Sequence, residues 1–410
     1  MKKIIVAISS VLLLMAMLSS SCSSGAAVAG WAGITMYNGD IFTVSGSGQL
    51  NIISAADLSS AGVIPIIETN SAGFSCSPAS SAVAIYGTPV VDGNRVYMAG
   101  YNGKIYVYSL TTNSFVVESK VLDKDNNHTI VGGMIVGNGL VYVGSSNGNL
   151  YALDADTLER VWKFSTNGKI WSTPVLVNGT VFVGSFDKKV YAIDATTGDE
   201  KWSKPIGGAM MATPVVVGGV VYVVSFDRHI YAFDEITGEQ KWKTPVEGQN
   251  NKTPKEWFWA TPVLFNGFLY APCLDGYVYA VDIANPSNVI TFDLQAAISA
   301  SPVVSGGKVV VVTEKGQVYT LDAASKSQRL VVDLRIADIQ PSLTVRSQVY
   351  AADGVVYIHS LFPDKVYAIT DLDTGAFRSR AMEAVSGGSA PTTVTVTETK
   401  TETRTVTVTK

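Results

Sequence analysis

The stretch AIDATTGDEKW at residues 192–202 recurs forty residues later as AFDEITGEQKW, at residues 232–242. A third copy, ALDADTLERVW, occupies residues 152–162 and carries Leu158 where the other two carry Gly198 and Gly238. A fixed period of this size is typical of one supersecondary unit that is stacked many times. The repeat therefore predicts an array of similar units.

Each period contains four short strand-like stretches separated by turn signals. In the copy that begins at Thr173, we expect strands at residues 173–177, 180–185, 189–194 and 200–204. Asn178-Gly179 lies between the first two, and Asn-Gly is a strong hairpin signal because both central residues need positive φ. Four antiparallel strands at this period predict one blade of a β-propeller.

The first turn of the unit can be followed along the whole chain. It is expected at Asn38-Gly39, Asp92-Gly93, Asn138-Gly139, Asn178-Gly179, Gly218-Gly219, Asn266-Gly267, Gly306-Gly307 and Asp353-Gly354. A valine or aromatic residue follows each: Phe42, Tyr97, Tyr142, Phe182, Tyr222, Tyr270, Val310 and Tyr357, with a mean spacing of 45 residues. These eight units predict an all-β, eight-bladed propeller over residues 30–384. Residues 30–36 could start its first blade or complete its last.

The repeated phrase Ala-x-Asp-x-x-Thr-Gly-x-x-x-Trp resembles the tryptophan-docking motif of eight-bladed propellers of the pyrroloquinoline-quinone (PQQ) dehydrogenase type. The same superfamily includes the non-enzymatic BamB-like lipoproteins, which are outer-membrane protein assembly factors. The resemblance implies that each Trp docks on the adjacent blade, while the Asp and the Thr-Gly pair fix the turn. It assigns these roles to Trp162, Trp202, Trp242, Asp154, Asp194, Asp234, Gly198 and Gly238.

The resemblance also raises the alternative of a quinone-dependent dehydrogenase. Such enzymes commonly cap the quinone with a disulfide between adjacent cysteines and bind Ca²⁺ through Glu, Asn and Asp. This chain has no adjacent cysteine pair, and no carboxylate matches those calcium-binding or base positions. We therefore expect no catalytic residue, no cofactor and no metal site.

Other clusters of polar residues have simpler interpretations. One aspartate recurs in each unit at Asp154, Asp194, Asp234, Asp282 and Asp322, and a second set lies at Asp187, Asp227 and Asp275. We expect all of them to accept hydrogen bonds within turns. His128, His229 and His359 share no metal-type spacing. The oxygen-rich residues 123–128 lack the Gly and distal Glu of an EF-hand, so a solvated loop is expected.

The N-terminus has the features of an export signal. Lys2-Lys3 precedes an apolar stretch at residues 4–18, which is short for a membrane span. Cys22 then follows small residues, which resembles a lipoprotein signal at residues 1–21, with Cys22 acylated and residues 22–29 as a linker. Cleavage after Ala27-Val28-Ala29 is the alternative.

In an exported protein Cys76 and Cys273 could form a disulfide, but two separate thiols are expected.

Composition and the C-terminus limit the partners. The formal net charge is −4 without a block of Lys or Arg, which disfavours nucleic acid. Hydrophobic residues make up 47% of the chain and charged residues 16%, in keeping with a large β core. Residues 385–410 form a Gly/Ser linker and a Thr-rich segment, which we expect to be a disordered tail outside the propeller.

Large side chains precede some of the innermost strands and form a candidate partner surface. They are Trp171, Met210, Met211, Trp257, Phe258 and Trp259. The last three end an insertion at residues 247–259, and long loops with exposed aromatic residues often bind partners. Alternatively, these residues plug the channel or fill gaps between blades.

We expect a monomeric, exported lipoprotein that faces the periplasm or the cell exterior. It would be a protein-binding scaffold in envelope protein assembly, or a generic surface protein that binds a glycan or a protein.

Overall fold

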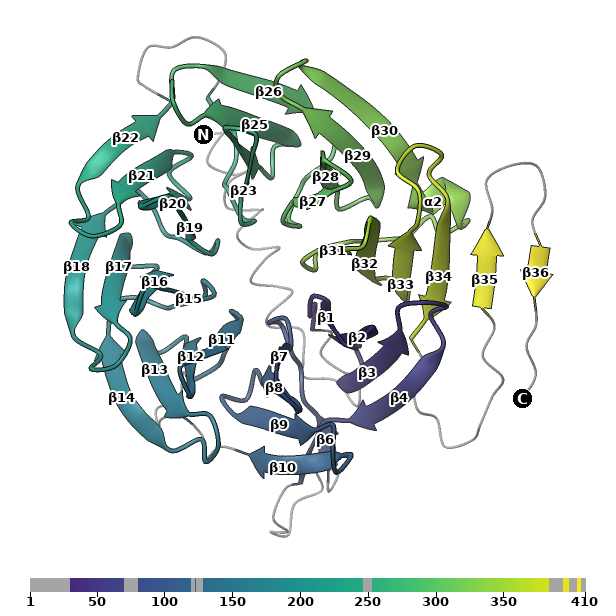
Figure 1. The fold of residues 1–410 in the computed structure, drawn as a ribbon, viewed down its shortest axis with the longest axis horizontal. Coiled ribbons are helices and arrows are strands. Elements are labelled where there is room, and N and C mark those ends of the chain that lie inside the picture. The colour runs from purple at the N-terminus through teal and green to yellow at the C-terminus, as the bar shows by residue number, and fades with distance from the viewer. Residues whose placement is uncertain are drawn as a thin grey trace, which may run out of the picture.

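The strands assemble into a ring of antiparallel sheets around a central axis (Figure 1). The computed structural model describes residues 30–69, 80–118, 122, 128–245, 253–382, 394–397 and 404–406. In this part of the chain, eight blades each contain four consecutive strands, of which the first is the innermost. The all-β, eight-bladed propeller expected from the repeat is confirmed.

The strands of blades 1 to 4 have the following bounds. Blade 1 contains β1 (Thr35–Tyr37), β2 (Asp40–Val44), β3 (Gln49–Ser54) and β4 (Ser60–Pro65). Blade 2 contains β7 (Val90–Asp92), β8 (Arg95–Ala99), β9 (Ile105–Ser109) and β10 (Ser114–Glu118). Blade 3 contains β11 (Met134–Gly137), β12 (Leu140–Gly144), β13 (Asn149–Asp154) and β14 (Arg160–Ser165). Blade 4 contains β15 (Val175–Val177), β16 (Thr180–Gly184), β17 (Lys189–Asp194) and β18 (Glu200–Pro205).

Blades 5 to 8 repeat the pattern. Blade 5 contains β19 (Val215–Val217), β20 (Val220–Val224), β21 (Ile230–Asp234) and β22 (Gln240–Thr244). Blade 6 contains β23 (Val263–Phe265), β24 (Phe268–Pro272), β25 (Tyr277–Asp282) and β26 (Val289–Asp293). Blade 7 contains β27 (Val303–Ser305), β28 (Lys308–Val312), β29 (Gln317–Asp322) and β30 (Ser327–Asp333). Blade 8 contains β31 (Tyr350–Ala352), β32 (Val355–Leu361), β33 (Asp364–Ile369) and β34 (Phe377–Ala381).

The first turn of each blade has the backbone conformation that its sequence requires. Asn178 has φ 48° and Gly179 has φ 69°, so this two-residue turn continues the right-handed twist of its strands. In blade 2 the turn lies one residue later than the expected Asp92-Gly93. Asp92 pairs with Arg95, which leaves Gly93 and Asn94 as the turn residues. This register also places Tyr97 at the same offset from its turn as Tyr142 and Phe182.

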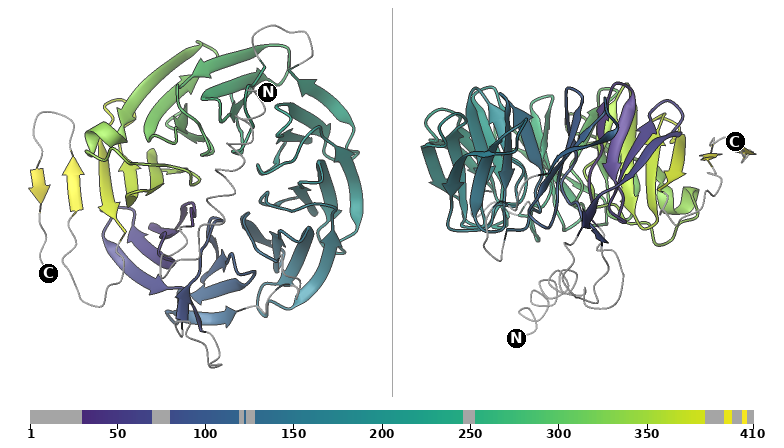
Figure 2. Two further views of the ribbon diagram at one scale, coloured as in Figure 1. Left: turned by 180° about the vertical axis from the view of Figure 1, so that it is seen from behind. Right: turned by 90° about the horizontal axis from the view of Figure 1, so that it is seen from below.

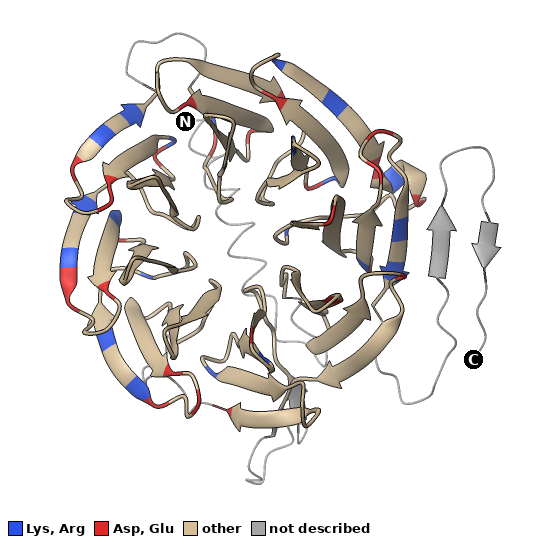
Figure 3. Cartoon of the chain, in the orientation of Figure 1, with Lys and Arg blue, Asp and Glu red and all other residues tan. Residues whose placement is uncertain are grey.

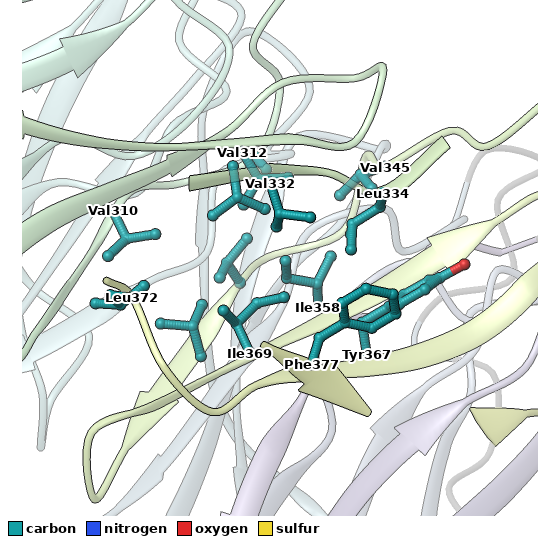
Figure 4. Packing of buried hydrophobic residues seen from close by; sticks show 14 of the residues in the cluster. Val310, Val312, Val332, Leu334, Val345, Ile358, Tyr367, Ile369, Leu372 and Phe377 are labelled. Carbon is teal, nitrogen blue, oxygen red and sulfur yellow. The ribbon is translucent and has the colours of Figure 1, made fainter. Parts of the chain in front are cut away.

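Hydrophobic side chains fill the space between neighbouring blades. Each of the eight buried clusters found among the described residues combines residues from two adjacent blades. Figure 4 shows one of them, in which Val310 and Val312 of blade 7 pack near Ile358 of blade 8. Burial of such a side chain contributes about 1.5–3 kcal/mol, so the inter-blade clusters are the main source of stability.

The ring closes where blade 1 packs against blade 8. Ile34 and Ile41 share a buried cluster with Tyr357 and Val366. Residues 35–37 form the innermost strand of blade 1, so the chain start does not complete the last blade. Closure therefore depends on side-chain packing and hydrogen bonds between two four-stranded units that lie far apart in sequence.

Residues 394–397 and 404–406 form strands, in a segment for which the composition predicts a disordered tail. β35 (Val394–Thr397) pairs with β34, and β36 (Arg404–Val406) pairs with β35, which extends the sheet of blade 8 to six strands (Figure 1). Two properties favour this pairing. The outer strand of a blade offers unpaired backbone groups, and alternating Thr and Val have high β propensity.

The two faces of the ring carry different connections. One face, here called the turn face, bears the turn between the first and second strands and the turn between the third and fourth strands of each blade. The other, here called the loop face, bears the remaining turns and the connections between blades. It carries the two-stranded sheet of β5 (Ile67–Thr69) and β6 (Ser80–Ala82) and the helix α2 (Leu334–Ala337) (Figure 2). Because elaborated connections commonly carry function, the loop face is where a binding site is expected.

Candidate functional site: the rim of the central channel

Eight equivalent side chains surround the mouth of the channel on the loop face. Each lies three or four residues before the innermost strand of its blade. These rim residues are Trp31, Tyr86, Val131, Trp171, Met211, Trp259, Ser299 and Arg346. They line a hollow together with the polar residues Thr88, Thr173, Thr213, Thr261, Ser301 and Gln348. The lining therefore combines aromatic and apolar side chains with hydroxyl, amide and guanidinium groups, which suits an occupant that has both apolar and polar groups.

A polar ring lies next to the rim and joins neighbouring blades. Thr173 Oγ1 accepts a hydrogen bond from the backbone N–H of Gly133 at 2.9 Å. Thr261 Oγ1 accepts one from Thr213 at 3.0 Å, and Ser301 Oγ accepts one from Thr261 at 3.1 Å. These hydroxyl groups hold the inner strands together, so they also fix the positions of the rim residues.

Five aromatic residues form a continuous belt across blades 4 to 6. The ring centroid of Phe226 is 5.0 Å from that of Trp257 and 6.0 Å from that of Trp259, and both pairs are stacked. Phe186 lies 5.8 Å from Phe226 and 4.7 Å from Trp171. All five are partly exposed on the loop face. We call Trp171, Phe186, Phe226, Trp257 and Trp259 the aromatic belt.

Two members of the expected partner surface are not accessible. Met210 and Phe258 are each 0% exposed. Met210 belongs to the cluster between blades 4 and 5, and Phe258 lies 5.8 Å from Tyr279, its ring edge-on. The chain is extended here, so successive side chains alternate between core and surface. The expectation that these two residues contact a partner is therefore wrong.

Phe186 and Phe226 were missed by the sequence reasoning. They lie directly after Ser185 and Ser225, in the turn between the second and third strands, where only a structural turn was expected. The signal that could have found them is a large apolar residue at a turn position, immediately before Asp187 and Asp227.

The opposite part of the rim is also aromatic, and it includes a cation. Trp31 and Tyr86 meet edge-on with their centroids 4.4 Å apart, and Tyr101 lies 5.2 Å from Tyr86. Burial, together with Tyr101, raises the pKa of Tyr86 to about 12, so this phenol is neutral at physiological pH. Arg346 Nε lies 3.5 Å from a carboxylate oxygen of Glu314. Figure 3 shows that Lys and Arg are more frequent on the outer strands, such as β22 and β34.

The residues assigned to blade docking connect adjacent blades. The indole N–H of Trp162 in blade 3 donates to the carbonyl oxygen of Ala195 in blade 4 at 3.0 Å. A Cβ atom added at Gly198 would lie 2.8 Å from the Trp162 ring, and one at Gly238 would lie 2.6 Å from the Trp202 ring. Trp242 is half-buried and packs against the buried cluster between blades 5 and 6.

Leu158, the exception in the repeat, keeps the positive φ of the glycine position at 56°. Its side chain is buried in the cluster between blades 2 and 3.

The repeated aspartates bind their own turns. Asp194 Oδ1 accepts backbone N–H groups of Thr196 and Thr197 at 2.9 and 3.0 Å, and Asp154 and Asp234 repeat this arrangement. These backbone hydrogen bonds lower the pKa of all three carboxyl groups. Among the described residues, no three His, Cys, Asp or Glu side chains are grouped as a metal site would need.

The second aspartate set also acts locally. Asp187 accepts the phenol O–H of Tyr191 at 2.6 Å, Asp275 accepts that of Tyr279 at 2.8 Å, and Asp227 accepts that of Tyr231. Burial, and then the hydrogen bond to Asp187, raises the pKa of Tyr191. These pairs fix the turn that carries Phe186 and its equivalents.

Several expected features lie outside the described residues: Cys22, Cys76, residues 123–127 and residues 247–252. Cys273 is described as a free, buried thiol that donates to the carbonyl oxygen of Glu256 at 3.3 Å. Burial raises its pKa, which makes it an inert core residue. In the part of the chain that is described, no helix is long and apolar enough to span a membrane.

The comparisons with known proteins agree with this architecture. The sequence model of one family, described as outer membrane protein assembly factor BamB, matches residues 23–164, 154–255 and 248–394. No curated protein matches the sequence. The crystal structure of BamB from Moraxella catarrhalis is similar with a TM-score of 0.63 and 17% identity, over 81% of this chain and 91% of that chain. The computationally designed Ika8 protein is similar with a TM-score of 0.64 and 15% identity, over 83% and 96%.

Proposed function

The chain belongs to the family described as outer membrane protein assembly factor BamB, and from this premise we propose that it is an exported lipoprotein that binds envelope proteins. The propeller would act as a non-enzymatic scaffold in outer-membrane protein assembly. The shared fold supports a binding scaffold of the BamB type in general terms. It does not identify the partner, because one fold can host many functions. The proposal therefore depends on the site.

The aromatic belt is the observation that carries this proposal. Trp257, Phe226 and Trp259 form a partly exposed stack on the elaborated face of the ring. Aromatic residues dominate the energetics of protein interfaces, because they bury a large area at a low cost in side-chain entropy. A stack that is already packed also loses little conformational freedom when a partner binds.

The arrangement of the polar groups supports a scaffold. The aspartates repeated in each blade hold their own turns, and they are distributed around the ring. The hydroxyl groups next to the rim join neighbouring blades. The polar side chains therefore stabilise a rigid frame, while the aromatic belt remains available for contact.

We further propose that acylated Cys22 anchors the mature chain to a membrane. Mass spectrometry of the mature N-terminus tests this point directly. A lipid-modified Cys22 at the N-terminus supports the anchor. An unmodified start at Gly30 contradicts it and supports cleavage after Ala29.

Capture of native envelope partners tests the protein-binding role. We expect the wild-type protein to recover a subunit of the barrel-assembly machinery, and Trp257→Ser to lose most of that recovery. Ile236→Ser is the matched control, because Ile236 is 85% exposed on the turn face. Equal recovery by wild type and Trp257→Ser would exclude the belt as the contact. Recovery of a glycan or a surface-layer protein would support the generic surface-binding alternative.

A further inference from the structure

A second apolar surface lies on the loop face of blade 8. It consists of Ile336, Ile339 and Phe362, which are 76%, 84% and 57% exposed. We call these three residues the apolar knob. Sixteen residues separate β30 from β31, compared with nine between β18 and β19, and the extra length contains α2 and Ile339. Contiguous exposed apolar side chains are typical of surfaces that contact a protein or a membrane.

Hydrogen bonds hold the knob in a defined shape. Asp338, which follows α2, accepts hydrogen bonds from Lys365 Nζ at 2.7 Å and from the Tyr367 hydroxyl at 2.8 Å. The carbonyl oxygen of Thr344 accepts a hydrogen bond from the backbone N–H of Leu361 at 2.8 Å, and the N–H of Thr344 donates one to the carbonyl oxygen of Phe362 at 3.1 Å. These contacts bring the segment after α2 next to the turn that carries Phe362.

The backbone at Ile339 is strained. Its φ is 53°, in the left-handed region, which is unfavourable for a β-branched residue. Strain of this kind persists where the surrounding structure imposes it, and it is enriched at functional sites. Here it accompanies an isoleucine side chain that is 84% exposed.

The position of the N-terminal end of the propeller indicates what contacts the knob. Trp31 lines the rim on the loop face, and blade 1, which begins beside it, packs against blade 8. Cys22 lies eight residues before Gly30. Even when fully extended, eight residues span at most about 26–29 Å. A lipid on Cys22 therefore keeps the loop face, which carries the knob, within reach of the bilayer.

We propose that the apolar knob contacts the lipid surface as a second membrane attachment. The inference depends on the lipid anchor at Cys22 proposed above. With the edge of blades 8 and 1 against the bilayer, the propeller is tilted. Blades 4 to 6, which carry the aromatic belt, lie across the ring and remain open to a protein (Figure 1). Weak insertion of apolar side chains at the interface adds to a lipid anchor, because stable attachment commonly needs two signals.

Vesicle flotation of the mature chain from residue 22 with Cys22→Ser, which carries neither the lipid nor the apolar residues 4–18, tests the knob alone. The probe is a vesicle of phosphatidylethanolamine and phosphatidylglycerol. Replacement of the knob by Ile336→Asn, Ile339→Asn and Phe362→Ser should weaken binding by about tenfold or more, because most of the exposed apolar area is lost. Ile236→Asn on the turn face should bind like the Cys22→Ser parent. Circular dichroism verifies folding, and Ile336→Asn alone serves if the triple variant unfolds. If the triple variant of the knob binds vesicles as strongly as the Cys22→Ser parent, the proposal is overturned.

A fluorescent probe tests the orientation of the lipidated protein. An environment-sensitive fluorophore is attached at Ile339→Cys, or at Ile236→Cys as the control, in a Cys76→Ser background. Quenchers placed on the lipid acyl chains should quench the probe at position 339 and leave the probe at position 236 unaffected. Equal quenching at both positions overturns the tilted orientation.

The outcomes separate this proposal from the proposed function. Mass spectrometry reports the lipid independently, and the Trp257 variant reports protein capture independently. A knob that binds a purified protein but no vesicle would overturn the bilayer contact and identify the knob as a protein interface.

Discussion

The indole N–H of Trp202 in blade 4 donates a hydrogen bond to the carbonyl oxygen of Glu235 in blade 5, at 3.0 Å. The ring of Trp202 is 7% exposed and packs on Gly238 of the same turn in blade 5. One side chain therefore links the outer strand of one blade to the turn of the next by both packing and hydrogen bonding.

Replacement of this tryptophan should destabilise the ring. We expect Trp202→Ala to lower the free energy of unfolding by about 3–5 kcal/mol, through the lost burial and the cavity left behind. Chemical denaturation measures the change. Val161→Ala, at a side chain that is 53% exposed in blade 3, should change little. An unaltered unfolding curve for Trp202→Ala would rule out the docking role.

Alanine substitutions at two glycines distinguish the cost of backbone strain from the cost of a clash with a neighbouring side chain. Gly198 has φ 79° and lies against Trp162, whereas Gly179 has φ 69° with no heavy atom within 4 Å of an added Cβ. Gly179→Ala should cost about 1–2 kcal/mol from strain alone, and Gly198→Ala should cost more because the methyl group collides with the indole. Thermal unfolding of the two variants gives the comparison. Equal losses would show that Trp162 moves away without cost.

Stability should depend on acidic pH through the turn aspartates. The pKa values of Asp154, Asp194 and Asp234 lie below the ordinary 3.8, mainly because backbone N–H groups stabilise the carboxylates. Their contribution is therefore present above pH 3.8 and is lost as the pH falls through the lower folded values. The melting temperature should decline below about pH 4. The double variant Asp194→Asn/Asp234→Asn should have a lower melting temperature at neutral pH, and its melting temperature should decline less steeply as the pH falls. If the melting temperatures of the variant and the wild type declined in parallel with pH, this role of the aspartates would be contradicted.

The neighbours Trp257 and Phe258 should respond differently to the same replacement. Phe258→Ser should lower the free energy of unfolding by about 3–5 kcal/mol, because Phe258 is fully buried. Trp257→Ser should change it far less, because the ring is partly exposed. Urea denaturation of both variants provides the measurement. A similar loss for the two would mean that Trp257 is a core residue and would weaken the partner surface.

Ring closure should depend on a buried histidine in blade 8. Nδ1 of His359 lies 2.9 Å from the carbonyl oxygen of Ala32, and Nε2 lies 2.7 Å from a carboxylate oxygen of Asp364. Asp364 also accepts the backbone N–H of Gly46 in blade 1 at 2.8 Å. His359→Leu leaves these groups without their buried hydrogen-bond partner and should cost about 1–3 kcal/mol. Hydrogen exchange should show the increased opening first in blades 1 and 8. Uniform exchange around the ring would contradict this local role.

The repeat made most of the architecture predictable. Local turn chemistry is encoded by neighbouring residues, so Asn178-Gly179 and the strands around it were found where expected. Blade 2 shows the limit, because Asp92-Gly93 and Gly93-Asn94 are both acceptable turns locally. The pairing of Asp92 with Arg95 selects the second.

The candidate site was only partly predictable. Trp171 and Trp257 stand out in the sequence, but the contacts of Phe226 with Phe186 and with Trp257, which complete the belt, join different blades. The same limit explains Met210 and Phe258. Each is adjacent to an accessible residue, and only the packing of two blades determines which side chain enters the core.

The sequence by itself determined the number of blades and most of their strands and turns, because the hydrophobic alternation and the turn residues act over a few positions and recur. The tertiary structure alone decided how blade 1 meets blade 8, which aromatic side chains form the belt, and that Ile336, Ile339 and Phe362 are exposed on the loop face. These features arise from contacts between blades. Such contacts depend on the curvature of the closed ring, which no local stretch of sequence specifies.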